Sequence, residues 1–85
     1  MSTITETKAK PVSIPVGFQW RSVGGKEWVV TGLLPGGVCK IHQVGRYVSG
    51  EMYSRDIRAG LGEGRYVKID TTDEARAILR RCNFR

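Results

Sequence analysis

Two glycine pairs, Gly24-Gly25 and Gly36-Gly37, interrupt a stretch of alternating apolar and polar residues that runs from residue 16 to residue 44. Alternation places successive side chains on opposite faces of a strand, and glycine tolerates the positive φ angles of tight hairpin turns. The stretch therefore predicts antiparallel strands joined by short turns. Pro35, just before the second glycine pair, adds a further turn-forming residue.

The first glycine pair also predicts a register. A two-residue turn centred on this pair sets Val23 opposite Lys26 and Trp20 opposite Val29. Continuing the count gives one largely apolar face for the core, which consists of Val16, Phe18, Trp20, Val29, Thr31 and Leu33.

The other face of this predicted hairpin carries Arg21 opposite Trp28, with Lys26 near the turn. Three interpretations of this surface remain open. The arginine and the indole could form a local cation–π pair. They could instead form a platform that stacks a base and binds the phosphate beside it. In the third interpretation a later segment of the chain covers Trp28, because tryptophan is usually well buried.

Residues 38–44 predict a third strand, with Cys39 and Ile41 on one face and Lys40 and His42 on the other. Cys39 and His42 have the spacing of half a zinc site. A structural zinc site takes four ligands and the chain offers few more, so we expect no bound metal.

Cys39 and Cys82 are the two cysteines of the chain. Two cysteines do not make the dense disulfide framework of small secreted domains, and no apolar run of signal-peptide length begins the sequence. We therefore expect free thiols and a cytoplasmic location, with a disulfide between the two as the alternative. No stretch approaches the length that spans a membrane.

The segment 46–59 allows two interpretations. In the first, Ser49-Gly50 forms a turn between two strands, which the aromatic and β-branched residues of the segment favour slightly. In the second, Ser49 caps a helix that places Tyr53 and Ile57 on one face and ends near Gly60. The glycine-rich residues 60–64 that follow predict a flexible connector rather than a phosphate-binding loop, because a strand over residues 64–69 comes next.

A C-terminal helix is predicted from residue 71 onward. Thr71 and Glu74 have the spacing of a capping box, in which each side chain bonds the other residue's amide. An apolar stripe for packing on the sheet consists of Ala75, Ile78, Leu79 and Cys82. The outer side carries Arg76, Arg80 and Arg81, which either complement the helix dipole in solvent or bind phosphates.

Together these elements predict an α+β fold, in which an antiparallel sheet of about four to five strands carries one C-terminal amphipathic helix on one face. Residues 1–14 are rich in Ser, Thr, Lys and Glu and predict a disordered or loosely docked tail. Residues 15–85 would then form a single compact domain. A chain of this length buries only about 60% of its unfolded surface, which leaves little room for a deep cavity.

The chain has 14 Lys and Arg against 8 Asp and Glu, a net charge of +6. Such an excess favours a polyanionic partner, and the interleaved aromatic residues favour nucleic acid. Since no nucleophile–base arrangement is recognisable, we expect a non-catalytic protein without cofactor that binds nucleic acid, single-stranded or with weak specificity. The candidate binding residues are Arg21, Lys26, Trp28, Lys40, Arg76, Arg80 and Arg81.

An alternative function uses the same residues. The chain could be a protein-interaction module or inhibitor that docks its basic face on an acidic or nucleic-acid-binding surface of a larger protein. An exposed edge strand in so small a sheet would also allow a homodimer.

Overall fold

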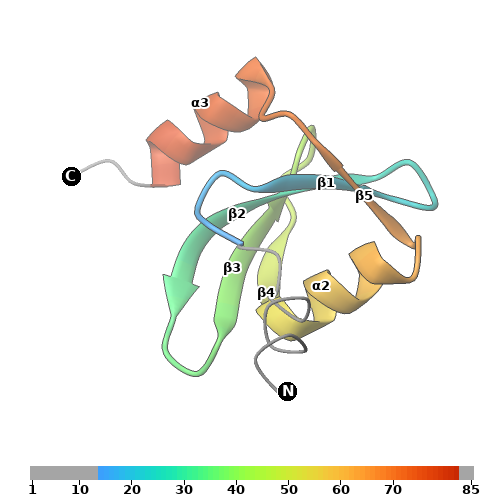
Figure 1. Ribbon diagram of the computed structural model, residues 1–85. Helices are drawn as coiled ribbons and strands as arrows, with labels where there is room; N and C mark the ends of the chain where they lie inside the picture. Colours follow the sequence, from blue (N-terminus) through green and yellow to red (C-terminus); the bar gives the residue numbers. More distant parts are fainter. Residues whose placement is uncertain (1–13, 83–85) are drawn as a thin grey trace.

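The computed structural model describes residues 14–82. Along the chain these residues form β1 (Gln19–Ser22), β2 (Glu27–Leu34), β3 (Val38–Gln43), β4 (Ser49–Tyr53), α2 (Ser54–Gly62), β5 (Tyr66–Ile69) and α3 (Asp73–Cys82) (Figure 1). The predicted N-terminal tail lies outside the described residues, apart from Ile14, whose side chain is buried in the core.

The five strands form one curled antiparallel sheet in the order β4-β3-β2-β1-β5. The first four strands follow one another as a meander, and β5 returns to pair with β1 (Figure 1). The predicted mixed fold with an antiparallel sheet is therefore confirmed. The sequence predicted one helix, however, and the structure contains a second helix, α2, between β4 and β5.

The first hairpin differs from its predicted register by one residue. The amide of Ser22 donates to the carbonyl of Lys26 over 2.8 Å, so the turn has three central residues instead of two. A two-residue turn of the predicted type needs positive φ at both glycines, but only Gly25, with φ of 87°, has it. Trp20 consequently pairs with Trp28, and not with Val29.

The sheet packs a helix on each of its two faces. On the face of Trp20, α2 contributes Ile57 to a core whose buried members are Ile14, Phe18, Trp20, Val30, Cys39, Ile41 and Ile57. The opposite face carries a smaller core, in which Val29 packs with Ala75 and Ile78 of α3. Successive strand residues point to opposite faces, so the shift in register moves Val29 to the side of α3. The prediction that the Trp20 face and the α3 stripe close one core is therefore wrong.

The segment after β3 matches neither prediction completely. Ser49 and Gly50 lie within β4, where they pair with His42 and Ile41, so they form no turn. The helix that follows begins at Ser54, not at Ser49, and Gly60 lies inside it. The predicted strand over residues 64–69 is confirmed as β5, which begins at Tyr66.

The predicted C-terminal helix is present, but its cap lies one residue later than expected. The hydroxyl of Thr72, and not that of Thr71, accepts a hydrogen bond from the amide of Ala75 over 3.2 Å. Thr71 instead donates its hydroxyl to the carbonyl of Gly17 over 2.7 Å, which ties the start of the helix to the chain before β1. Neither helix within residues 14–82 combines the length and the apolar character needed to cross a bilayer.

Candidate functional site

The structure separates Arg21 from Trp28, the two residues that the sequence placed side by side. Trp28 is half-buried against the main core on the face of Trp20. Arg21 points to the opposite face, where its guanidinium donates to the carboxylate of Glu27 over 2.9 Å. The one-residue shift in register causes the separation, because it moves Trp28 to the other face relative to Arg21. None of the three interpretations is met in full, because Trp28 lies on the face of Trp20 and is half-buried against the main core.

The other predicted residues are spread over the molecule. Lys26 is exposed beside the first turn, whereas Lys40 pairs with Gly32, roughly 20 Å farther along the chain of β2. On α3, Arg76 donates to Asp73 over 2.9 Å. Arg80 and Arg81 are exposed on the same helix. Of the seven predicted residues, only Arg81 lines the groove described next.

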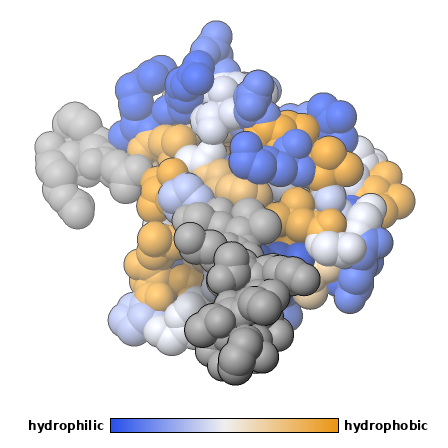
Figure 2. All heavy atoms as spheres, in the orientation of Figure 1, coloured by the Kyte–Doolittle hydropathy of each residue, from blue (hydrophilic) through white to orange (hydrophobic). Residues whose placement is uncertain are grey.

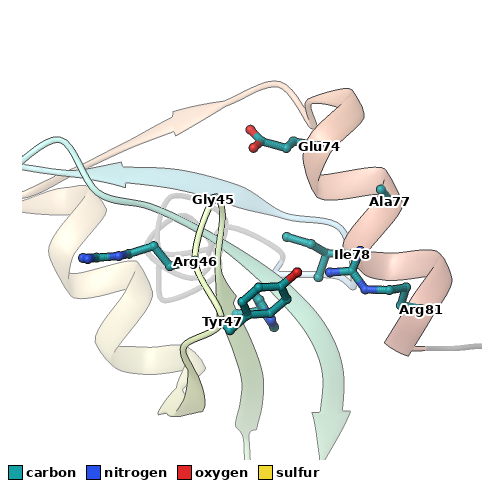
Figure 3. Close-up of a pocket in the computed structure, with 8 residues that line it drawn as sticks. Gly45, Arg46, Tyr47, Glu74, Ala77, Ile78 and Arg81 are labelled. Carbon is teal, nitrogen blue, oxygen red and sulfur yellow. The ribbon is translucent and has the colours of Figure 1, made fainter.

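A groove of about 230 Å³ lies between α3 and the turn that joins β3 to β4. Its lining consists of His42, Gly45, Arg46, Tyr47, Glu74, Ala77, Ile78 and Arg81 (Figure 3). One wall is therefore a helix and the other a turn, and the two walls are about thirty residues apart in sequence.

Both walls are fixed by backbone bonds or by packing. In the turn, the amide of Gln43 donates to the carbonyl of Val48, and the amide of Val44 donates to Glu27 of β2, each over 2.8 Å. The helix is held by Ala75 and Ile78, which pack against the sheet in the smaller core. The sheet therefore holds both walls of the groove in place.

Tyr47 is the most exposed large hydrophobic residue among those described, with 94% of its surface accessible. Figure 3 shows its ring between the turn and α3, with Arg81 on the helix side and Arg46 extending away from the helix. An aromatic ring presented to solvent beside a guanidinium group such as that of Arg81 can stack a planar ligand and bind an anionic group next to it.

The cations of the groove are available for a ligand. The three ion pairs recorded within residues 14–82 join Arg21 to Glu27, Arg65 to Glu63 and Arg76 to Asp73. None of them uses Arg46 or Arg81. His42, which also lines the groove, donates its Nδ1 proton to the carbonyl of Gln43 over 2.9 Å.

Sequence reasoning missed Arg46, Tyr47 and Glu74 as site residues. Gly45-Arg46-Tyr47-Val48 recurs later in the chain as residues 64–67, and this repeat was the available signal. The second copy leads into β5, whereas the first copy lies in the turn between β3 and β4. The same four residues thus have different surroundings: the first copy faces α3 across the groove, whereas Tyr66 of the second copy packs against Gly60 of α2.

The cysteines occupy different environments. Cys39 is buried in the main core, and burial raises the pKa of its thiol above the ordinary value while Arg58 acts in the opposite direction. Cys82 is exposed at the end of α3, and neither thiol is in a disulfide. In the described part of the chain, no three His, Cys, Asp or Glu side chains come together in an arrangement that could hold a metal ion.

Comparison of the chain with protein-family models, with curated proteins and with solved structures gave no match.

Proposed function

We propose that the protein is a non-catalytic nucleic-acid-binding module that holds a single-stranded segment in the groove between α3 and the β3–β4 turn. The observation that carries the proposal is the exposed Tyr47 ring, which lines this groove together with Arg46 and Arg81. Stacking on an aromatic ring suits the unpaired bases of a single strand, and guanidinium groups suit its phosphates. The bases of a duplex are already stacked on one another and offer no free face to such a ring.

The charge of the whole molecule supports the same ligand. The net charge of +6 attracts polyanions over a distance set by the ionic strength. The outer side of α3 is hydrophilic (Figure 2), and it carries Arg80 next to the groove residue Arg81. These charges would guide a strand toward the groove without reading its sequence.

Fluorescence anisotropy tests the proposal with a labelled oligodeoxycytidine of about 12 nucleotides. Binding should weaken steeply as salt rises from about 50 to about 200 mM. Tyr47→Ala should cost about 1–3 kcal/mol of binding free energy, since it removes the stacking surface. Arg81→Ala should weaken binding as well. It should reduce the slope of log Kd against log salt concentration by about 0.7, which is the contribution of one phosphate contact in a single strand.

Arg76→Ala is the matched control, because Arg76 lies on the same helix, pairs with Asp73 and does not line the groove. Its effect on affinity should be small. Undetectable binding at low salt, or equal effects of Arg76→Ala and Arg81→Ala, would contradict the proposal.

A second candidate function, docking on another protein, is favoured by an apolar surface at the far end of the sheet. Leu34, Val38 and Tyr53 lie side by side across β2, β3 and β4, and the first and last are 37% and 44% exposed. Leu33, the preceding residue of β2, points to the opposite face and is 56% exposed, and Figure 2 shows hydrophobic residues at the surface over this end of the strand. Such a patch beside the edge strand β4 suits a protein partner.

Capture from a nuclease-treated lysate separates the two functions. A single stoichiometric protein that binds the wild type and Tyr47→Ala, but not Leu34→Ser/Tyr53→Ser, would support docking through the apolar surface. Loss of every partner after nuclease treatment would argue for nucleic acid instead.

A further inference from the structure

Glu74 places a negative charge in a groove that is otherwise lined by cations and neutral residues. A carboxylate there repels phosphates, so on its own it weakens the binding of any polyanion. In the first turn of α3 its charge complements the helix dipole, a role that leaves the carboxylate oxygens without a bonding partner within residues 14–82. The hydroxyl of Thr72 caps α3 at the amide of Ala75, and Asp73 forms the ion pair with Arg76, whereas Glu74 takes part in no recorded bond of either kind.

The carboxylate lies where the groove meets the β3–β4 turn. A Cβ atom at Gly45 would be 3.9 Å from Glu74 Oε2, so the Glu74 side chain spans the groove toward the turn backbone. Figure 3 shows Glu74 directed from α3 toward this side.

Glu74 and Arg81 are seven residues apart on one side of α3, or about 10 Å along the helix axis. Both line the groove, as does Tyr47 from the opposite wall. The groove thus offers an anion-binding group at one end, an aromatic ring, and an acceptor at the other end. A nucleotide has a matching order of groups: a phosphate, a planar base, and polar atoms on the outer edge of that base.

The edges of the bases differ in what they offer to a carboxylate. An ionised carboxylate only accepts hydrogen bonds, so it is matched by an exocyclic amino group and repelled by a carbonyl. Cytosine presents an amino group at the position where uracil presents a carbonyl, and the two bases are otherwise nearly identical in size.

We infer that Glu74 selects the base held on Tyr47 by accepting a hydrogen bond from its exocyclic amino group, so that the groove prefers cytosine to uracil. This inference rests on the proposed function, because it requires that a single strand occupies the groove. It adds a specificity that phosphate contacts and stacking do not provide.

The test compares oligodeoxycytidine with oligodeoxyuridine of equal length at neutral pH, by anisotropy, for three forms of the full chain. The wild type should bind the cytidine strand at least about 10-fold more tightly. Glu74→Gln should reduce this preference to within about 2-fold, because the glutamine amide can also donate to the uracil carbonyl. Its overall affinity should rise, since a negative charge is removed.

Glu51→Gln is the matched control, because Glu51 is an exposed acidic residue of β4 that does not line the groove. It removes the same charge, so any gain in absolute affinity that comes from charge alone should appear here too, while the preference for cytidine should be kept. Circular dichroism of each variant establishes that the fold is retained.

The outcomes distinguish this inference from the function on which it rests. If the wild type binds both strands equally while Tyr47→Ala and Arg81→Ala still weaken binding, the inference about Glu74 is wrong and the proposed function stands. An equal loss of preference in Glu51→Gln would also overturn it. If the wild type binds neither strand at low salt, the proposed function itself fails.

Discussion

Gly60 lies inside α2 because of the ring that packs against it. A Cβ atom at this position would overlap the ring of Tyr66, which in turn packs against Trp20 with ring centroids 5.8 Å apart. Glycine normally weakens a helix interior, but here its missing side chain lets β5 approach α2 closely. This one residue therefore sets the spacing between the helix and the edge of the sheet.

Gly60→Ala should destabilise the protein by about 1–3 kcal/mol, because the new methyl group must displace the Tyr66 ring. Gly62→Ala is the control in the same helix, since no atom lies within 4 Å of its added Cβ. It should change stability by about 0 to 1 kcal/mol in the stabilising direction. Urea unfolding measures both, and equal effects of the two substitutions would contradict the packing argument.

The two thiols should react at different rates. Cys82 is exposed, whereas Cys39 is buried and burial raises the pKa of its thiol, which lowers the fraction of reactive thiolate near pH 8. An aromatic disulfide reagent should therefore modify one thiol rapidly in the folded protein and the second only after denaturation. Two equal rates of modification would contradict the burial of Cys39.

The same burial makes the stability of the protein depend on pH. Because the thiol of Cys39 ionises at a lower pH in the unfolded chain than in the folded protein, the free energy of unfolding should fall as the pH rises above the ordinary thiol pKa.

At the scale of elements, the sequence predicted the parts that depend on local pattern. The strands from β1 to β3, β5, and the helix α3 all follow from alternation or from an apolar stripe. The register of the first hairpin could not be predicted, because it depends on the φ angle that Gly24 adopts. The segment that forms β4 and α2 has residues that suit both strand and helix, so the contacts with β3 and the main core decide its structure.

The cap of α3 makes a testable distinction between Thr72 and the capping box expected from the sequence. Thr72→Ala should cost about 1 kcal/mol of unfolding free energy, because it removes the acceptor for the Ala75 amide. Thr72→Ser keeps a hydroxyl at this position and should therefore lose much less stability than Thr72→Ala. Glu74→Gln should stay within about 0.5 kcal/mol of the wild type, because Glu74 takes no part in the cap. If thermal unfolding showed a larger loss of stability for Glu74→Gln than for Thr72→Ala, the capping box expected from the sequence would be supported instead.

At the scale of the whole molecule, the candidate site depends on how distant elements pack. The β3–β4 turn and α3 meet because Val44 and Leu79 adjoin the small core that holds α3 on the sheet. No local pattern shows this meeting, so the sequence identified Arg81 but placed it with residues that lie elsewhere. The charge and aromatic pattern favoured the first hairpin as the binding site. In the structure, however, its Arg21 is paired with Glu27 and its Trp28 is half-buried.

If the groove between α3 and the β3–β4 turn binds single-stranded nucleic acid, the amides of its two walls should respond to the ligand. Amide proton–nitrogen correlation spectra, recorded while an oligodeoxycytidine is titrated into the protein, show which amides respond. The largest shifts should fall on residues 44–48 and on the Glu74–Arg81 side of α3, and Tyr47→Ala should diminish them. Largest shifts at residues 21–26, or no shifts at low salt, would contradict the account.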